Sequence, residues 1–150
     1  MSAVVAFPTG TGRFQTLLDV PGGAILSDEP VDVGGLGSGP TPYQLLSAAL
    51  AACTSMTLRL YAERKGWSLP AFEVTVAHEM TGGRDRFARR IGFAQPVTAE
   101  WQARLLEIAD KCPVHRTLIR GFEVVTEAGS DKPEEPGEQH MLDMEEVCAD

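Results

Sequence analysis

The segment that decides the fold reads GPTPYQLLSAALAACTSMTLRLYAERKG and covers residues 39–66. Its start is typical of a helix, because Thr41 can cap the first turn, Pro42 fits within that turn and Gln44 completes a Thr-x-x-Gln capping pattern. Gly66 is a typical stop signal. The sequence therefore predicts one helix of about 24 residues, roughly 36 Å long.

The first half of this predicted helix is apolar or small on every side. No charged residue occurs from Leu45 to Cys53, and a helix without a polar face is buried nearly all round. One small domain struggles to surround a helix of this length. We therefore expect burial both within the chain and against a second subunit.

The size and charge of the chain exclude several classes of protein. A chain of 150 residues and 16.1 kDa, with 43% hydrophobic residues, suits one globular domain. No stretch approaches the ~18 to 20 uninterrupted apolar residues of a membrane-spanning helix, and residues 1–8 do not resemble a secretory signal. We expect a cytoplasmic protein with no membrane partner. The net charge of -8 argues against nucleic acid as a partner.

The acidity is concentrated at the C-terminal end. Residues 128–150 hold eight acidic residues and one basic residue, with two prolines among them. Such a composition is typical of a mobile extension. The sequence predicts a folded domain over residues 1–127 and a flexible acidic tail over 128–150, with a short amphipathic turn between Met141 and Val147.

The remaining pattern alternates short strands with one more helix. Hydrophobic periodicity and turn residues predict strands at Phe14–Val20, Ala24–Ser27, Phe72–Met80, Phe87–Phe93 and Phe122–Thr126, and a helix from Thr98 to about Lys111. The expected class is α+β, with antiparallel sheets packed against a long buried central helix and a second helix.

Two of the three cysteines lie on the inner faces of the two predicted helices. Cys53 is twelve residues into the first, and Cys112 continues the apolar stripe of the second. Each can be a small buried hydrophobe, but two such thiols could also meet and form a disulfide. A reactive thiolate needs a cation nearby, for which Arg13 and Arg116 are the candidates. Cys148 reads as incidental.

Other polar patterns have ordinary structural interpretations. Cys112 and His115 have zinc-ligand spacing, but a structural site needs four ligands, and His115 as the base of a cysteine hydrolase lacks a local nucleophile signature. His78 falls on the apolar face of its strand and reads as a satisfied core histidine. The glycines at 34–39 lack the ending of a phosphate loop. A solvated sheet edge is the expected role of the hairpin arginines Arg84, Arg86, Arg89 and Arg90.

The cysteine contexts resemble those of a known family. The stretch 39–62, around Ala51-Ala52-Cys53, and the stretch 108–115, around Lys111-Cys112-Pro113, are similar to the OsmC/Ohr family of thiol-dependent peroxidases. The resemblance covers roughly residues 9–126. It implies the OsmC-like fold and an intertwined homodimer with active sites at the subunit interface.

The resemblance also implies roles for individual residues. Cys53 would attack an organic hydroperoxide, and its sulfenate would condense with Cys112 to a disulfide that a dithiol reductant, such as a lipoylated protein, reduces. Arg13, which follows a glycine forty residues before Cys53, would stabilise the thiolate. No cofactor and no metal are expected. Peroxidase branches of the family have a glutamate where this chain has Tyr43.

Gln44 beside Tyr43 is also uncharged, so Arg13 would be held by a hydroxyl or amide instead of a carboxylate. We expect Tyr43, Gln44 and Met56 to contact the substrate. The alternative function is a non-enzymatic protein of the OsmC-like branch that binds a hydrophobic small molecule or senses oxidation. A metal-binding protein is the third interpretation.

Overall fold

The computed structural model describes residues 3–129 and 146–148, and the chain divides into two compact units. Unit 1 comprises residues 1–46 and 126–138, and unit 2 comprises residues 47–125 and 139–150. The division falls inside the long central helix. Most of the predicted acidic tail, including most of its amphipathic turn, lies outside the described residues, so both stay predictions.

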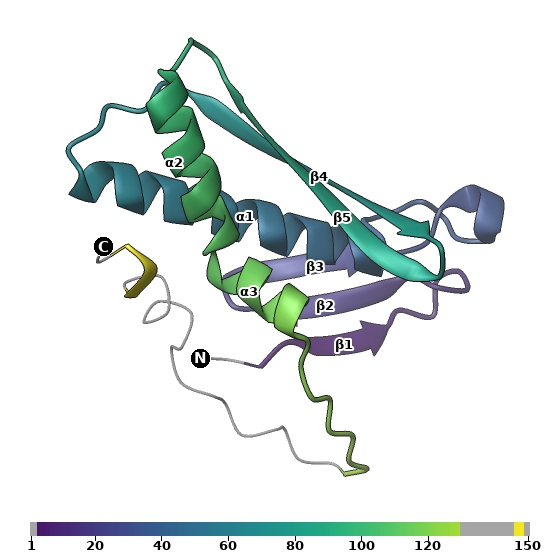
Figure 1. The fold of residues 1–150 in the computed structure, drawn as a ribbon. Helices are drawn as coiled ribbons and strands as arrows, with labels where there is room; N and C mark the ends of the chain where they lie inside the picture. The colour runs from purple at the N-terminus through teal and green to yellow at the C-terminus, as the bar shows by residue number, and fades with distance from the viewer. Residues whose placement is uncertain (1–2, 130–145, 149–150) are drawn as a thin grey trace. The chain divides into compact units, whose positions relative to one another are not determined.

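Unit 1 contains a three-stranded antiparallel sheet in the order β1-β2-β3 (Figure 1). The strands are β1 (Val5–Pro8), β2 (Thr16–Val20) and β3 (Gly23–Ser27). The predicted hairpin is confirmed, with Val20 opposite Gly23 across the turn. Gly22 has a φ of 88° in that turn, a left-handed conformation that glycine adopts without strain.

The glycine-rich loop after β3 is organised by Asp28. It begins with a short 3₁₀ turn, η1 (Val31–Val33). The Asp28 side chain accepts hydrogen bonds from the backbone amides of residues 29, 36 and 38 and from the Ser38 hydroxyl. A Cβ atom at Gly35 or Gly39 would overlap a backbone carbonyl. The loop therefore needs its glycines for close packing.

The long helix α1 (Pro42–Arg64) matches the prediction within two residues at its C-terminal end. Both capping hydrogen bonds form: Thr41 N donates to Gln44 Oε1 at 2.9 Å, and Gln44 N donates to Thr41 Oγ1 at 3.3 Å. The stretch Pro42–Lys65 is long and apolar enough to cross a membrane by length and composition only, and 44% of the window tested is buried inside the chain.

Within the described residues, one face of α1 is buried. Its buried residues recur every three or four positions, and they are Ser47, Leu50, Cys53, Thr54, Thr57, Leu58, Tyr61 and Ala62. Met56, on another face, is 51% exposed. The expectation of burial nearly all round includes a second subunit, so it stays a prediction.

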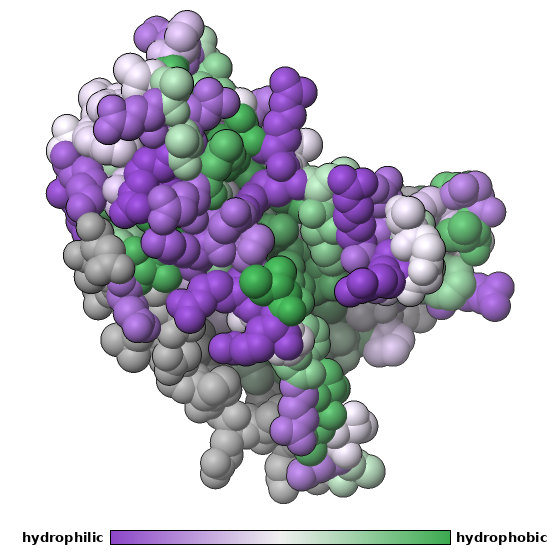
Figure 2. Space-filling model, viewed as in Figure 1, coloured by the Kyte–Doolittle hydropathy of each residue, from purple (hydrophilic) through white to green (hydrophobic). Residues whose placement is uncertain are grey.

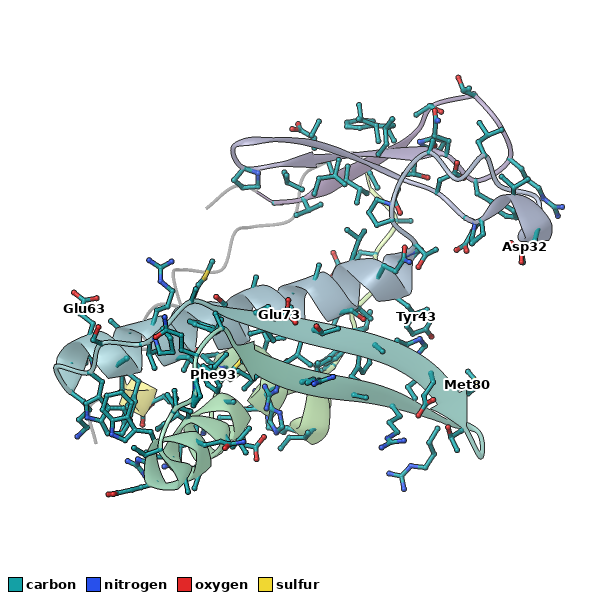
Figure 3. The ribbon with its side chains drawn as sticks, turned by 90° about the horizontal axis from the view of Figure 1, so that it is seen from above. Asp32, Tyr43, Glu63, Glu73, Met80 and Phe93 are labelled. Atoms are coloured by element: carbon teal, nitrogen blue, oxygen red, sulfur yellow. The ribbon has the colours of Figure 1, made fainter. Side chains whose placement is uncertain are left out.

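Unit 2 packs a long β-hairpin and two shorter helices against this face of α1. The hairpin consists of β4 (Phe72–Thr81) and β5 (Arg84–Phe93), followed by α2 (Ala99–Asp110) and α3 (Pro113–Arg120). The hairpin passes beside α1, with Met80 at its turn and Phe93 at its other end (Figures 1 and 3). The predicted β4, β5 and α2 are confirmed, and with them the α+β class.

Two hydrophobic clusters hold unit 2 together. The larger joins α1 to α2 and is formed by Leu58, Tyr61, Leu105, Ile108, Ala109 and Cys148. The smaller joins α1 to the start of α3 and is formed by Leu50, Cys53 and Cys112, covered by Val76, Phe87, Val114 and Leu118. Both cysteines of interest therefore belong to the second cluster.

The predicted last strand, Phe122–Thr126, is wrong for the described chain. After α3 ends at Arg120, residues 121–129 have no regular secondary structure. Phe122 is 66% exposed and Val124 is 74% exposed, and Figure 2 shows hydrophobic and hydrophilic residues side by side along this segment. The residue types of this segment favour a strand, but a strand forms only when it pairs with another strand. The described residues supply no partner strand here.

Candidate functional site

Cys53 sits on the buried face of α1. It is 3% exposed, and its neighbours on the helix, Leu50 and Thr54, are buried with it. The small side chains around position 53 allow another element to approach the helix closely. That element is the turn between α2 and α3, which carries the second cysteine.

Cys112 lies at this turn. Helix α2 ends at Asp110, and Cys112 is the N-cap of α3, with Pro113 in the first turn where its missing N–H is tolerated. Cys112 is fully buried, and its Sγ lies 2.9 Å from that of Cys53. The prediction that the inner faces bring these two cysteines together is confirmed.

The two sulfurs differ in their surroundings. The contact with the Cys53 sulfur lowers the pKa of Cys112, and the amides of His115 and Val114 and the Thr54 hydroxyl act in the same direction against burial. The same contact and burial raise the pKa of Cys53, whereas the Val114 amide and the Thr57 hydroxyl act to lower it. Hydrogen-bond donors therefore surround both sulfurs, and the proton state of each depends on the other.

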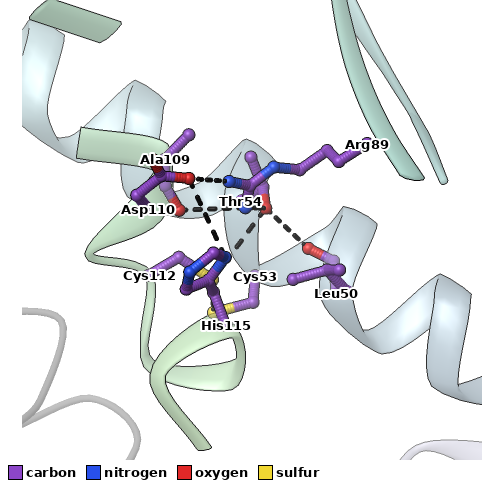
Figure 4. A network of polar contacts seen from close by, with 8 residues as sticks. All are labelled: Leu50, Cys53, Thr54, Arg89, Ala109, Asp110, Cys112 and His115. Carbon is purple, nitrogen blue, oxygen red and sulfur yellow. Dashed lines mark hydrogen bonds and ion pairs between the residues drawn. The ribbon is translucent and has the colours of Figure 1, made fainter. Parts of the chain in front are cut away.

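Arg89 is a largely buried cation of this region, although the sequence analysis named only Arg13 and Arg116 as candidate cations. Its side chain is 11% exposed, and its guanidinium donates to Thr54 Oγ1 at 2.9 Å, to the Ala109 carbonyl oxygen at 2.9 Å and to Asp110 Oδ1 at 2.8 Å (Figure 4). Arg116, by contrast, is exposed. The expectation of a solvated edge is thus wrong for Arg89.

A signal for Arg89 was present in the strand alternation. Phe87, Arg89 and Ile91 occupy the same face of β5 and are all partly buried, whereas Ala88 and Arg90 are exposed. An arginine on the apolar face of a half-buried strand needs internal partners. Arg89 therefore differs from the other three hairpin arginines, which are exposed: Arg84, Arg86 and Arg90.

His115 lies beside the same network. Its Nδ1 is 3.9 Å from Asp110 Oδ1. Burial and the nearby Arg89 charge lower the pKa of His115, and Asp110 only partly opposes them. His115 is therefore neutral at pH 7, and the positive charge of this network belongs to Arg89.

The histidine and metal interpretations can be compared with the structure. His78 Nε2 is 2.8 Å from Asp85 Oδ1, and its ring lies 4.8 Å from that of Phe87. His78 is thus partly buried and satisfied, close to the expectation. Within residues 3–129 and 146–148, no group of three or more His, Cys, Asp or Glu residues is placed to hold a metal ion.

Of the other candidate residues, Arg13, Tyr43 and Gln44 belong to unit 1, and Met56 belongs to unit 2. The Arg13 guanidinium stacks 5.1 Å from the Phe14 ring centre within unit 1, Tyr43 is 45% exposed, and Gln44 takes part in the capping described above. Met56 lines an open groove of about 870 Å³ on α1. The activating role of Arg13 and the three substrate contacts stay predictions.

Cys148 is buried and contacts the backbone of Thr57. Its Sγ lies 3.8 Å from the Thr57 carbonyl oxygen, and burial raises the pKa of this thiol. Cys148 thus packs as a small hydrophobe in the larger cluster, as expected of an incidental cysteine.

Comparison with known families identifies the fold and its lineage. The family model described as OsmC-like protein matches residues 35–127, which include both cysteines of the site. The chain belongs to the OsmC-like protein family. No curated protein matches the sequence.

Solved structures of OsmC-like proteins share the fold at low sequence identity. A putative osmotic stress induced and detoxification response protein from Psychrobacter arcticus is 23% identical, with a TM-score of 0.66 over 78% of this chain and 88% of its own. An organic hydroperoxide resistance protein from Legionella pneumophila is 22% identical, with a TM-score of 0.58 over 81% and 91%.

A third structure, a putative organic hydroperoxide resistance protein from Vibrio cholerae with captopril bound in one of the active sites, is 22% identical, with a TM-score of 0.54 over 79% and 85%. The fold resemblance implied by the two cysteine contexts is therefore confirmed.

Proposed function

We propose that this OsmC-like protein is a thiol-dependent peroxidase that reduces organic hydroperoxides. The observation that carries the proposal is the 2.9 Å separation of the Cys53 and Cys112 sulfurs in a buried, largely apolar cluster. Two adjacent thiols can supply the two electrons that reduce a hydroperoxide and become a disulfide. Two of the structurally similar proteins are named for organic hydroperoxide resistance.

The proposed catalytic cycle has three steps. The Cys53 sulfur attacks the terminal hydroperoxide oxygen, so that the O–O bond breaks and an alcohol and a Cys53 sulfenic acid form. Cys112 then attacks the sulfenic sulfur, which forms the disulfide and releases the oxygen as water. A dithiol reductant, such as a lipoylated protein, exchanges with the disulfide and leaves as its own disulfide.

The apolar surroundings of the sulfurs support an alkyl or aryl hydroperoxide as the substrate. Val76, Phe87 and Leu118 cover the pair, and each methylene moved from water into such a site contributes about 0.8 kcal/mol. Cys53 is only 3% exposed, so the substrate enters when these side chains move. Arg13 would stabilise the reacting oxygen, and Tyr43, Gln44 and Met56 would contact the rest of the substrate.

A homodimer is part of this proposal. The stripe Ala49, Ala52 and Met56 on α1 is exposed in the single chain, although it is apolar and lies on the helix that carries Cys53. Burial of this stripe against a second copy would complete the surroundings of the site. We further propose that the protein acts in the cytoplasm.

The test is to mix reduced protein with one equivalent of cumene hydroperoxide and to identify the products by peptide mass spectrometry within seconds. We expect a Cys53–Cys112 disulfide in the wild type, a trapped Cys53 sulfenic acid in Cys112→Ser and no consumption beyond background in Cys53→Ser. Cumene hydroperoxide should react faster than hydrogen peroxide.

A Cys148→Ser variant is the matched control. Cys148 is buried in a different cluster from Cys53 and Cys112, so this variant should behave as the wild type does. Hydroperoxide consumption that does not depend on Cys53 would contradict the proposal.

One observation favours a second function. The absence of a carboxylate at Tyr43 removes the group that would hold Arg13 beside the reacting thiolate, and this slows nucleophilic attack. A protein that binds a hydrophobic small molecule or senses oxidation would keep this arrangement without rapid turnover. Unreacted Cys53 after minutes with cumene hydroperoxide would favour this function.

A further inference from the structure

Arg89 connects three elements of unit 2 around the two cysteines. From β5, its guanidinium donates to Thr54 Oγ1 on α1 at 2.9 Å, and to the Ala109 carbonyl oxygen at 2.9 Å and Asp110 Oδ1 at 2.8 Å on α2. Helix α1 carries one cysteine, and the end of α2 leads into the other. The guanidinium therefore acts on the sulfurs through the segments that it holds.

The buried charge of Arg89 fixes where its side chain lies. A guanidinium stays protonated in proteins, and a charge that is largely withdrawn from water needs close partners. The Ala109 carbonyl belongs to the last turn of α2, where carbonyls lack partners within the helix and the dipole favours a cation. Arg89 is therefore held at this helix end by the acceptors that its charge requires.

The backbone turn that carries Cys112 depends in part on a carbonyl that Arg89 also holds. The Cys112 backbone N–H donates to the Ala109 carbonyl oxygen at 3.3 Å, which is at the long end of the range for such bonds. The next residue, Pro113, has no N–H to donate. A shift of the Ala109 carbonyl would move Cys112 with it, and the 2.9 Å bond from Arg89 opposes such a shift.

On α1, Arg89 holds the residue next to Cys53. Thr54 is fully buried, and its Oγ1 accepts from Arg89 while donating to the Leu50 carbonyl oxygen at 2.7 Å. The same oxygen lies 3.9 Å from Cys112 Sγ. Because this hydroxyl is fixed from two sides, Arg89 links a defined point beside Cys53 to the turn that carries Cys112.

We propose that Arg89 is a positioning residue for disulfide formation, because it holds the turn that carries Cys112 against α1 and keeps the two sulfurs within reach. The sulfurs of Cys53 and Cys112 lie 2.9 Å apart as free thiols, and a disulfide bond is about 2.05 Å long. Closure needs only a short further approach while the turn stays in place. A pair held in this way has a high effective concentration.

The inference rests on the proposed function only for its consequence in turnover. There, the Cys112 sulfur attacks the sulfenic sulfur of Cys53. The S–S bond forms as the S–O bond breaks, and the hydroxyl leaves as water with the proton of the Cys112 thiol. Arg89 supports this second step because it keeps the attacking sulfur close to its target.

The test is a thiol–disulfide equilibrium that needs no hydroperoxide. The full chain with Cys148→Ser is equilibrated with mixtures of reduced and oxidised glutathione, and mass spectrometry after alkylation measures the fraction with a Cys53–Cys112 disulfide. Two electrons pass from the thiol pair to glutathione disulfide, which becomes two glutathione thiols. We expect Arg89→Gln to lower the equilibrium constant for disulfide formation about tenfold, which is about 30 mV for this two-electron couple.

Two further variants separate positioning from charge and from general stability. Arg89→Lys should recover only part of the constant, because an ammonium keeps the charge but lacks the planar fork of a guanidinium. The matched control is Arg86→Gln on the same strand, whose partner is the exposed Glu79, and it should leave the constant unchanged. A merely structural role would lower the free energy of unfolding in urea without moving the disulfide equilibrium of the folded protein.

If Arg89→Gln does not fold, Thr54→Val provides the second variant, because it removes the acceptor on α1 and keeps the branched shape of the side chain. The equilibrium constant should fall in it as well. A constant for Arg89→Gln, or for Thr54→Val in its place, that equals the constant of Arg86→Gln would overturn the inference.

Consumption of cumene hydroperoxide is measured separately, so that the two proposals can fail independently. A wild type that consumes none, with the expected glutathione equilibria, would remove the proposed function and leave the role of Arg89 standing. A wild type that consumes it through Cys53, with equal constants for Arg89→Gln and Arg86→Gln, would remove the role of Arg89 and leave the proposed function standing.

Discussion

Asp28 shows how one buried residue can determine a loop. It is 2% exposed, and its carboxylate accepts four hydrogen bonds from the loop that precedes α1. The Ser38 hydroxyl and then the amides of Glu29, Ser38 and Leu36 lower the pKa of Asp28, against the opposing effect of burial. A carboxylate with so many donors is a structural anchor, and it explains the glycine-rich loop without a ligand.

The lowered pKa predicts a loss of stability in acid. A carboxyl whose folded pKa is below its unfolded value stabilises the fold above the unfolded value, near 3.9 for aspartate, and this contribution is lost as the pH falls through the folded value. We expect Asp28→Asn to be less stable than the wild type at pH 7 and to lose less stability between pH 5 and pH 2. Urea unfolding over this pH range is the measurement.

The matched control for Asp28 is Asp32→Asn, on the exposed η1 turn of the same loop. It should resemble the wild type throughout. If Asp28→Asn loses as much stability in acid as the wild type does, then other carboxyl groups account for that loss, which would contradict the prediction.

At the scale of elements, α1 has a capped N-terminus, and a subset of its residues forms a buried face. The reciprocal bonds between Thr41 and Gln44 satisfy two amides at its N-terminus. Helix α2 begins in a similar way, with Thr98 Oγ1 accepting from Trp101 N at 3.2 Å. Side-chain capping therefore fixes where both helices begin, whereas tertiary contacts select which face of each is buried.

Removal of the α1 cap should lower stability without changing chemistry at the sulfurs. We expect Thr41→Ala to cost about 0.5–2 kcal/mol in the free energy of unfolding, and Thr41→Ser to cost little, because serine caps as well. Chemical denaturation measures the first effect, and the Cys53–Cys112 disulfide equilibrium should not change. A Thr41→Ala variant as stable as the wild type would mean that the cap is redundant.

For the whole molecule, the feature of interest is a second face of α1, which is exposed in the single chain. The exposed apolar residues Ala49, Ala52 and Met56 recur at helical spacing along it, and the segment 121–129 presents further apolar side chains. Exposed apolar stripes of this kind are typical of protein interfaces. A homodimer that covers the α1 stripe would satisfy the expectation of burial all round.

A charge on this stripe should separate the subunits. We expect Met56→Glu to shift the protein from dimer toward monomer in sedimentation velocity, because a dimer interface would leave the new carboxylate buried and unpaired. The control is Ala103→Glu, an exposed position on α2, which should leave the mass unchanged. A wild type that sediments as a monomer at micromolar concentration would contradict the homodimer.

The sequence by itself determined α1, α2 and the two hairpins β2–β3 and β4–β5, because capping residues, hydrophobic period and turn glycines act locally, but it did not predict β1 or α3. It predicted α1 with Thr41 and Gln44 at its start, the paired β4 and β5, and the inward placement of both cysteines. The last strand failed because a strand depends on a partner that no local pattern specifies. Only the tertiary structure decided that Arg89 turns inward between Thr54 and Ala109, because the hydrogen-bond partners of a buried charge come from segments distant in the chain.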